Sequence, residues 1–478
     1  MRRAKIVCTI GPASSKRGVM EKMLRAGMDV ARLNFSHGTH EQHAVNIANL
    51  RDVAEKMGKP LALLQDLSGP KVRLGDLFAP IILKRGQEIG LTADAVKEID
   101  RACPILPLPV PELIAVLRPN QMLLLDDGKI ALRVVKVEGE PGDPARIVWT
   151  KCVAGGELKT HKGVTAPGVR FQVPAVTEKD KDDLRFGLAQ GMDWVAASYV
   201  RCAEDLQPLR DVMAEVGIYA PIIAKIEKFE AVRNLESIVN AVDGIMVARG
   251  DLGVEMPFDE VPLVQKQIIR LCNQRGKPVI TATQMLESML TCPRPTRAEA
   301  ADVANAILDG TDAVMLSGET AAGEFPVEAV QTMARIAERA DDALHKVCDY
   351  GSRLSPLSNV TDAVARATAE IARQIGAAAI VCATRNGGTA RAVAQNRPTA
   401  RILGVTTEIA TYRRLALTWG VTPALITAVD DTDALLEACI AAALRAKVAK
   451  LNDRLVLTSG VPVNSPGTTN LIKVHTIG

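Results

Sequence analysis

The chain has 478 residues, with 58 Lys and Arg against 55 Asp and Glu, which gives a formal net charge of +3 at pH 7. This length exceeds what one hydrophobic core usually organises, so about three domains are expected. The nearly balanced charge gives no electrostatic reason to bind nucleic acid or an anionic membrane. An aromatic content of 3% argues against base stacking, and no apolar stretch is long enough to span a bilayer.

The cysteine pattern indicates a reducing compartment. Nine cysteines are scattered along the chain without a C-x-x-C pair, and most lie in apolar runs, as Cys8 and Cys382 do. Such a pattern is typical of reduced, buried thiols. The basic N-terminus is followed by an apolar run that stops at Gly11, too short for a signal peptide. We therefore expect a cytoplasmic protein.

Short apolar runs alternate with helical patterns over the first two thirds of the sequence. The eight expected strands cover residues 5–11, 29–36, 61–67, 193–200, 221–227, 243–249, 277–283 and 312–317. Eight strand–helix repeats predict a (β/α)8 barrel, with a doubly wound open sheet as the alternative. A helix is expected over 295–308, with Gly310 as its stop.

Residues 74–174 interrupt these repeats after the third strand. They contain proline clusters and alternating runs over 130–137 and 146–153, separated by turn signals such as Asp127-Gly128. We expect a small inserted β domain. Because it leaves the barrel at the carboxyl ends of the strands, where barrel active sites lie, it is expected to act as a lid.

A further α/β domain is expected beyond the barrel. Its predicted strands cover residues 378–383, 401–406, 424–426, 454–458 and 471–476. The predicted domain boundaries are 1–73 and 171–343 for the barrel, 74–170 for the inserted lid and 344–478 for the C-terminal domain.

Two consecutive strands end abruptly in charge. Lys225 and Glu227 lie two residues apart and therefore point to the same side of their strand, while Asp251 follows the next strand. One cation and two carboxylates at this edge can hold a divalent ion together with an anionic substrate. The alternative is an ordinary pair of solvated charged strand ends.

The second and third strands add further polar groups. Arg32, Asn34 and Ser36 share one face, which must line the barrel mouth. Arg32 can bind a phosphate or carboxylate with two donors, or simply pair with a core carboxylate; Asn34 and Ser36 offer oxygens for a hard cation. Asp66 ends the third strand, and Lys71 and Arg73 return toward the mouth after a Gly-Pro turn.

Glycines and hydroxyls mark the remaining strand ends. Gly250 and Gly253 flank Asp251 and allow a ligand to approach the backbone closely. Thr281 and Thr283 are expected on one face, and Ser317 ends the last strand; such hydroxyls can order water, although most at strand ends are structural. His37, His40 and His43 are not expected to bind a metal, since no Cys or carboxylate completes a tetrahedral set.

In the C-terminal domain, a strand is followed by a glycine-rich turn and a helix start at Thr384–Thr389. Hydroxyls and backbone N–H groups in such a turn can cradle a phosphate, or form a plain capped turn. The segment lacks the G-K-[ST] ending of a Walker loop.

The sequence resembles the pyruvate kinase family, in its bacterial form, over essentially the whole chain, and the matching motifs follow one another in the family's order. The matching runs are RLNFSHG (32–38), IAKIE (223–227), IMVARGDLGVE (245–255), ATQMLESM (282–289), PTRAE (295–299), DVANAILDG (302–310) and MLSGET (315–320). The resemblance implies a barrel, a lid and a C-terminal domain. It also implies phosphoryl transfer from phosphoenolpyruvate to ADP, giving ATP and pyruvate, in a homotetramer that can bind a phosphorylated effector such as AMP or a sugar phosphate.

The resemblance also implies roles for individual residues. Glu227 and Asp251 match the ligands of Mg²⁺, which Mn²⁺ can replace, while Lys225 and Arg32 match the groups beside the transferred phosphoryl group. The other matching positions are the backbone of Ala248, Gly250 and Asp251 for the substrate carboxylate, Thr283 over the enolate, Ser317 in a proton-donating water network, and Asn34, His37, Arg73 and Asp127 for the nucleotide and its metal.

Two departures from the family pattern bear on regulation. Many members carry Thr and Glu where this chain has Leu67 and Lys71, and a bound K⁺ neutralises that glutamate. Here Lys71 is expected to supply the charge near Asp66, Asn34 and Ser36, so K⁺ should not be required. The effector loop is altered too, since Asn386 replaces the usual Ser and Arg385 adds a cation beside Gly387 and Gly388.

Two other functions remain as alternatives. The first is a phosphoenolpyruvate or pyruvate barrel enzyme of the aldolase type, which shares the Glu-plus-Asp metal site but has no reason for a lid that closes on a nucleotide. The second is a non-catalytic regulatory relative, which would be expected to lose Lys225, Glu227 or Asp251; all three are present.

Overall fold

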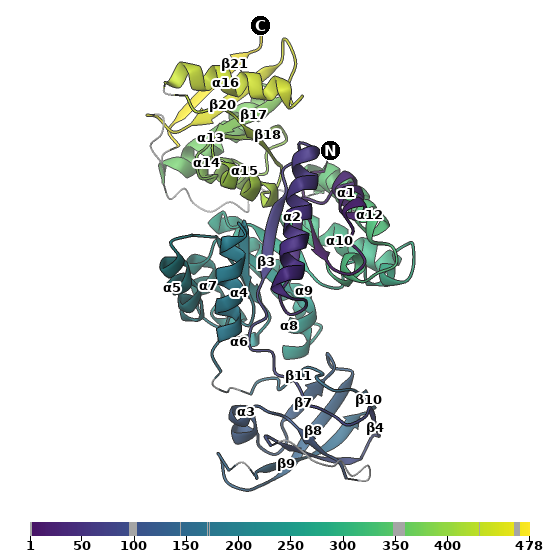
Figure 1. Cartoon of the computed structure of the whole chain (residues 1–478). Helices are drawn as coiled ribbons and strands as arrows, with labels where there is room; N and C mark the ends of the chain where they lie inside the picture. The colour runs from purple at the N-terminus through teal and green to yellow at the C-terminus, as the bar shows by residue number, and fades with distance from the viewer. Residues whose placement is uncertain are drawn as a thin grey trace.

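A computed structural model of the chain describes residues 2–94, 103–143, 145–169, 171, 173–347, 359–429, 431–462 and 469–478. Three bodies follow one another along the molecule, with the C-terminal domain at one end, a barrel in the middle and a β domain at the other end (Figure 1). The predicted boundary at Arg170 lies outside the described residues, and so does Cys348.

The central body is the predicted (β/α)8 barrel. Its strands are β1 (Lys5–Ile10), β2 (Val30–Asn34), β3 (Ala62–Asp66), β12 (Trp194–Ala197), β13 (Ile222–Ile226), β14 (Gly244–Ala248), β15 (Val279–Ala282) and β16 (Ala313–Leu316). All eight are parallel, and β1 pairs with β16 to close the sheet, with Lys5 opposite Ala313. Closure excludes the open doubly wound sheet.

Helices surround the barrel. They are α1 (Arg17–Ala26), α2 (His40–Lys56), α4 (Glu178–Ala189), α5 (Gln207–Val216), α6 (Phe229–Arg233), α7 (Leu235–Ala241), α8 (Arg249–Glu255), α9 (Val261–Arg275), α10 (Arg297–Asp309), α11 (Gly318–Ala321) and α12 (Pro326–Val347), with short 3-10 turns at Ala203–Leu206 and Glu287–Leu290. The helix predicted over 295–308 is α10, and its predicted stop at Gly310 is confirmed. Thr296 forms a capping box with Glu299, and Gly310 ends the helix with a φ of 106°.

Side chains alternate along the barrel strands between two cores. On β2, Ala31 and Leu33 pack outward with Phe35 against the helices, while Val30 packs inward with Leu64 and Met246. The inward apolar layers fill the barrel interior, so the polar inward positions are left at the carboxyl ends of the strands.

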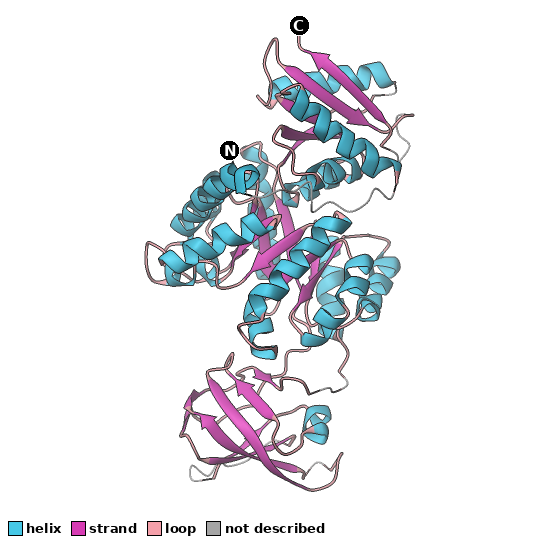
Figure 2. Ribbon diagram, turned by 180° about the vertical axis from the view of Figure 1, so that it is seen from behind, coloured by secondary structure: helices cyan, strands magenta, loops and turns pink. Residues whose placement is uncertain are grey.

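The inserted domain lies between β3 and α4. Its elements are β4 (Ile81–Leu83), β5 (Glu88–Thr92), β6 (Ile105–Pro107), α3 (Pro111–Val116), β7 (Met122–Leu125), β8 (Ile130–Glu138), β9 (Ile147–Ala154), β10 (Gly156–Leu158) and β11 (Val164–Thr165). A six-stranded sheet runs β11-β7-β8-β9-β5-β6, and β10 pairs with β4. The domain has its own apolar core and joins the barrel through thin connections (Figure 2).

The C-terminal domain is a five-stranded sheet covered by helices. Its strands are β17 (Ala379–Ala383), β18 (Arg401–Thr406), β19 (Val421–Leu425), β20 (Arg454–Ser459) and β21 (Leu471–Thr476); its helices are α13 (Val360–Gln374), α14 (Gly388–Gln395), α15 (Ile409–Arg414) and α16 (Thr432–Arg445), with a 3-10 turn at Leu415–Leu417. The order is β19-β18-β17-β20-β21, and only β21 is antiparallel to its neighbour.

The prediction for β19 was wrong at its start. The strand begins at Val421, three residues before the expected 424, directly after a turn at Gly420 with a φ of 68°. Pro423 does not interrupt it, because β19 is an edge strand and the missing N–H of a proline faces no neighbour there.

The C-terminal domain closes the base of the barrel. Ala416 and Leu417 belong to the same apolar cluster as the barrel interior, beside Trp194. The Arg414 side chain donates to the backbone oxygens of Asp193 and Tyr219. The lid and this domain therefore occupy opposite ends of the barrel (Figure 1). Within the described ranges, none of the helices combines the length and apolar character that crossing a bilayer requires.

Candidate active site

A carboxylate shared by two cations lies at the barrel mouth. Asp66, at the end of β3, is 1% exposed. One of its oxygens accepts a hydrogen bond from Arg32 Nε at 2.6 Å, and the other lies 3.3 Å from Lys225 Nζ. Arg32 Nη1 also donates to Thr9 Oγ1 at 2.9 Å. Arg32 therefore pairs with a core carboxylate, which was the alternative to a ligand-binding role, and it still lies at the mouth.

Lys225 connects this pair to a second carboxylate. Its Nζ lies 2.7 Å from Glu227 Oε1 and donates to Ser198 Oγ at 2.7 Å. Glu227 is buried, and its other oxygen accepts from the backbone N–H of Tyr199 at 2.8 Å. The prediction that Lys225 and Glu227 point to the same side of β13 is confirmed.

Burial and neighbouring charges shift the pKa values of these groups in different directions. For Lys225, burial lowers the pKa, but the charges of Asp66 and Glu227 outweigh it and the pKa is raised. For Asp66, burial raises the pKa, but Lys225 and Arg32 outweigh it and the pKa is lowered. Burial raises the pKa of Glu227, and the charge of Asp251 acts in the same direction. A further positive charge near Asp251 would therefore favour the ionised form of Glu227.

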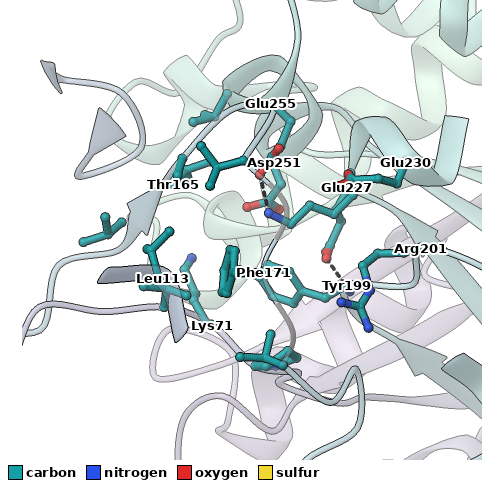
Figure 3. A pocket seen from close by; sticks show the side chains of 18 of the residues that line it. Lys71, Leu113, Thr165, Phe171, Tyr199, Arg201, Glu227, Glu230, Asp251 and Glu255 are labelled. Atoms are coloured by element: carbon teal, nitrogen blue, oxygen red, sulfur yellow. Dashed lines mark hydrogen bonds and ion pairs between the residues drawn. The ribbon is translucent and has the colours of Figure 1, made fainter. Parts of the chain in front are cut away.

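A cavity of about 450 Å³ lies between the barrel mouth and the lid. Glu227 and Asp251 line one side, while Lys71 and Phe171 face them from the lid connections (Figure 3). Asp127 of the lid lines the same cavity. The cavity is wide enough for a small substrate together with the end of a larger one.

The end of β15 departs from strand alternation. Thr283 has a φ of 66°, so it does not continue the face of Thr281 as expected. Thr281 is buried and donates to Thr311 Oγ1 at 3.0 Å, whereas Thr283 Oγ1 accepts from the N–H of Gly250 at 2.8 Å. Arg249 fixes this turn by donating to the Thr283 carbonyl at 2.8 Å while it pairs with Asp302.

The end of β16 carries a buried hydroxyl without a partner. Ser317 Oγ forms no hydrogen bond with the part of the chain that the structure describes. Its backbone N–H donates to Glu319 Oε2 at 2.7 Å, and Glu319 also accepts from the N–H of Leu286 at 3.1 Å. A buried free hydroxyl is costly unless water or a ligand accepts its hydrogen bond.

Sequence reasoning missed four residues of the site: Thr9, Ser198, Tyr199 and Glu319. Strand alternation from the inward Trp194 could have placed Ser198 at the mouth, as it placed Lys225 on the next strand. Thr9 could have been found in the same way from Val7. Tyr199 and Glu319 act through the backbone N–H of one and the carboxylate contacts of the other, for which the residue pattern holds no signal.

The charges of three cations act on the imidazole of His37. Burial lowers the pKa of its imidazole, and the charges of Arg73, Lys71 and Arg32 lower it further. Arg73 is held by donating to the carbonyl of His161 in the lid at 3.1 Å. The structure thus brings the predicted nucleotide-side residues to one edge of the mouth, although Asn34 uses its Oδ1 to accept the N–H of Ser36 at 3.1 Å.

The predicted contact between Lys71 and Asp66 is not formed. Lys71 is exposed and lines the cavity, its stem lies against Gly163, and within the described ranges it has no carboxylate at ion-pair distance. A turn at Gly69, with a φ of 65°, lies between Asp66 and Lys71. The Leu67 side chain packs outward with Leu184 and leaves only its carbonyl, which accepts from Ser198, near the mouth.

His40 and His43 each stack on an aromatic ring. His43 stacks on Phe35 at 4.1 Å and contacts the His37 carbonyl. His40 stacks on Phe186 and pairs with Asp183 at 2.7 Å. Across the described ranges, no cluster of three or more potential metal-ligating His, Cys, Asp or Glu side chains is present.

The predicted effector loop joins β17 to α14. Gly387 N donates to Thr384 Oγ1 at 3.0 Å, and Gly388 N donates to Asn386 Oδ1 at 3.1 Å. Thr389 Oγ1 contacts Thr469 Oγ1 at 2.8 Å, and the Arg385 guanidinium lies 3.5 Å from Glu408. The loop therefore satisfies the Gly387 and Gly388 donors with its own side chains.

The closed barrel, its charged mouth and the cavity beneath a separate lid define a (β/α)8-barrel enzyme for an anionic substrate. The model of the pyruvate kinase barrel domain matches residues 1–330, and that of the pyruvate kinase alpha/beta domain matches residues 362–475. The chain belongs to the pyruvate kinase family and is a phosphotransferase.

Individual relatives agree. The chain is 47% identical over 487 residues to a pyruvate kinase of Geobacillus stearothermophilus, covering 100% of the chain and 80% of the relative. It is 44% identical to pyruvate kinases of Staphylococcus epidermidis and Sporosarcina psychrophila, covering 100% of the chain and 81% of each relative. These matches support the kinase over the aldolase-type enzyme and the non-catalytic relative.

The shared carboxylate generates a prediction on stability. We expect Asp66→Asn to lower the free energy of unfolding by about 3 kcal/mol or more, because it leaves Arg32 and Lys225 buried with an uncompensated positive charge. The pKa of Asp66 is lowered, so its stabilising contribution is present at neutral pH and is lost only as pH falls below the usual aspartate range. Urea unfolding followed by tryptophan fluorescence measures the effect.

The matched control is Asp76→Asn, which removes an exposed carboxylate and should change the same free energy by no more than about 0.5 kcal/mol. Equal effects of the two substitutions would contradict the role of Asp66.

Proposed function

We propose that the cavity beneath the lid transfers the phosphoryl group of phosphoenolpyruvate to ADP, giving pyruvate and ATP. The observation that carries this proposal is the buried Lys225, held between Asp66 and Glu227, the second of which lines that cavity. Phosphoryl transfer needs positioning and neutralisation of negative charge rather than a covalent nucleophile. An ammonium whose pKa is raised by two carboxylates supplies a fixed positive charge at neutral pH.

The donor set fits one divalent cation, Mg²⁺ in the first place and Mn²⁺ as a substitute. Glu227 and Asp251 line one cavity, and the charge of Asp251 disfavours ionisation of Glu227, so a cation between them would relieve their repulsion. Mg²⁺ is commonly held by one or two carboxylates, with water and substrate oxygens completing its shell. When bound, the ion would neutralise substrate charge and polarise substrate oxygens.

The protein groups divide the remaining work. Arg32 is held by Asp66 and Thr9 with its guanidinium at the mouth, where it can donate to the phosphoryl oxygens. The backbone at Ala248, Gly250 and Asp251 would hold the substrate carboxylate. Because the Gly250 N–H already donates to Thr283, substrate binding must free this donor and turn the Thr283 hydroxyl toward the enolate.

Proton delivery to the enolate is assigned to water ordered by hydroxyls. Ser317 Oγ is buried and has no partner in the described part of the chain, so it can hold a water molecule beside the substrate. Thr283 would supply the second contact once its hydroxyl leaves Gly250. A proton held by this pair reaches the methylene carbon of the enolate, which becomes the methyl group of pyruvate once the phosphoryl group has left the enol oxygen.

The nucleotide is assigned to the edge of the mouth beside the lid. Arg73 and Lys71 place positive charge around His37 there, and Asp127 of the lid lines the same cavity. Asn34 completes this edge. Closure of the lid over this edge would exclude water, which otherwise accepts the phosphoryl group.

We propose that K⁺ is not required. Lys71 does not contact Asp66, but it adds to the cations that converge near His37. Two unit charges about 4 Å apart interact by roughly 4 kcal/mol at an effective dielectric of 20, so a monovalent cation beside these groups would be repelled. The Leu67 side chain also offers no oxygen, since it packs away from the mouth.

We also propose an effector site at Thr384–Thr389 for a phosphorylated compound such as AMP or a sugar phosphate. Its support is the loop geometry, in which Gly387 and Gly388 donate to the Thr384 and Asn386 side chains and could exchange them for phosphate oxygens. Arg385 is exposed and would add charge.

We also propose that the chain forms a homotetramer and works in a reducing cytoplasm. Exposed apolar side chains such as Phe258 and Leu263 on the barrel are available for subunit contacts. The eight described cysteines are free, which agrees with a reducing compartment.

The first test concerns Lys225. We expect Lys225→Met to lower kcat by about 10²- to 10³-fold, since it removes a preorganised charge beside the reacting group. Phosphoenolpyruvate should still bind, as measured by fluorescence titration with Mg²⁺ present. Lys181→Met is the matched control, because Lys181 is a surface residue paired with Glu178. Retention of more than about a tenth of kcat would contradict the assignment.

The second test concerns the metal. Glu227→Gln and Asp251→Asn should each raise the Mg²⁺ concentration for half-maximal activity by about tenfold or more, since each removes a hard oxygen ligand. Because the pKa of Glu227 is raised, Mn²⁺ affinity of the unaltered chain should begin to fall, as pH is lowered, above the usual glutamate range. Electron paramagnetic resonance of Mn²⁺ measures this. Unchanged metal curves in both variants would remove the site.

The third test concerns K⁺. The rate in tetramethylammonium buffer should equal the rate with KCl at matched ionic strength. Lys71→Glu should create K⁺ dependence, alone or together with Leu67→Thr, because the new carboxylate recruits the ion. Lys71→Gln, which removes the charge without adding a carboxylate, is the control. A large K⁺ activation of the unaltered chain would show the proposal to be wrong.

The fourth test concerns the effector loop. Isothermal titration should detect binding of AMP or of a sugar phosphate, and Thr384→Ala and Thr389→Ala should each weaken it about tenfold, since each removes a hydroxyl donor. Thr432→Ala, on the separate helix α16, should leave the affinity unchanged. An affinity that neither loop substitution changes, or the absence of binding by any of these compounds, would refute the site.

A further inference from the structure

A second, smaller cavity lies at the junction of the barrel base and the C-terminal domain. Its volume is about 20 Å³, and its charged lining consists of Lys277, Arg391 and Arg397 against one carboxylate, Asp312. Lys277 and Asp312 come from the barrel, whereas Arg391 lies on α14 and Arg397 follows that helix. The cavity is remote from the mouth, because it lies at the end of the barrel that the C-terminal domain covers (Figure 1).

The innermost cation of this cavity has an unused donor. Arg397 is 3% exposed. Its Nη2 donates to the Gly310 carbonyl at 2.8 Å and lies 3.0 Å from Asp312 Oδ1, and its guanidinium lies 4.5 Å from the centre of the Trp419 ring. Its Nη1 is buried and forms no hydrogen bond with the described residues. A buried guanidinium donor without an acceptor is costly, so a bound species is expected to accept from it.

The other two cations leave the positive charge uncompensated. Arg391 Nη1 donates to the Asn386 carbonyl at 3.2 Å, and Lys277 Nζ donates to the Val242 carbonyl at 2.7 Å. In the described ranges, neither side chain has a carboxylate at ion-pair distance. Burial lowers the pKa of Arg391, and the charge of Asp243 opposes this only in part. Neutral carbonyls orient these cations but do not cancel their charge.

We propose that this cavity binds one small inorganic anion of the size of chloride, between Arg397 and Arg391. A cavity of about 10–15 Å³ is enough for a single water molecule, so the available space fits a monatomic ion rather than an organic ligand. The lining offers several N–H donors and a carboxylate that Arg397 already engages, which favours an anion over a neutral water.

The bound anion would join the two domains. Arg397 contacts Gly310 and Asp312 of the barrel, while Arg391 holds the Asn386 carbonyl in the loop of the C-terminal domain at 384–389. An anion bridging the two guanidinium groups adds charge-assisted hydrogen bonds across the junction. Any ligand that binds the folded junction alone raises the melting temperature.

The first arm of the test is crystallographic. Crystals of the full chain soaked in sodium bromide, measured at the bromine absorption edge, should show an anomalous peak within hydrogen-bond distance of Arg397 Nη1. Absence of bromide from the cavity, whether water is seen there or not, would overturn the proposal.

The second arm is in solution. Melting temperatures of the full chain are compared in sodium chloride and in sodium gluconate at equal ionic strength, because gluconate is too large for the cavity. The unaltered chain should melt at a higher temperature in chloride, with a dose dependence that gives an apparent affinity. Arg391→Gln should weaken that affinity at least tenfold, and Arg373→Gln, a surface cation on α13 with its own partner Glu370, should not.

Lys277→Met replaces Arg391→Gln if the latter fails to fold, and the same loss is expected. Equal melting in the two salts, or a chloride effect that both cavity substitutions leave intact, would refute the site. Bromide in the crystal without a chloride effect in solution would mark an adventitious halide and would also overturn the proposal.

Discussion

The barrel mouth depends on one buried carboxylate. Asp66 lies between Arg32 and Lys225. Both cations are too deeply buried for water to stabilise their charge without a carboxylate. Burying an unpaired charge costs several kcal/mol, whereas a hydrogen-bonded pair roughly balances its desolvation. The arrangement therefore adds little to stability and fixes where two positive charges lie.

Barrel closure makes this arrangement possible. Arg32, Asp66 and Lys225 come from three strands, of which β2 and β3 are neighbours and β13 is separated from β3 by β12. Ser198, at the end of β12, fills that gap and accepts from Lys225 while it donates to the Leu67 carbonyl. The Ser198 hydroxyl is thus held by Lys225 on one side and by the Leu67 carbonyl on the other. The apolar layers below exclude water and keep the effective dielectric low, which strengthens every contact in the network.

The sequence predicted those parts of the site that follow from strand alternation. Arg32, Lys225 and Glu227 could be placed at the mouth because side chains on a strand point inward at every second position. Thr283 could not be placed in this way, since its φ of 66° ends the alternation and turns its hydroxyl to Gly250. Lys71 was misplaced because it follows a turn, where direction depends on backbone angles that residue types do not specify. The residues of the lid connections that line the cavity, such as Phe171, depend on how two domains meet, and strand periodicity carries no information on that.

The strands β12 and β13 run from the base of the barrel to its mouth. At the base, Arg414 of the C-terminal domain holds the backbone oxygens of Asp193 and Tyr219, which lie just before β12 and β13. At the other end, the same two strands lead to Ser198, Lys225 and Glu227. The strands are short, being four and five residues, and their side chains are packed on both faces. A densely packed core moves as a unit rather than absorbing strain. β12 and β13 therefore join the contacts with the C-terminal domain at the base to the charged side chains at the mouth.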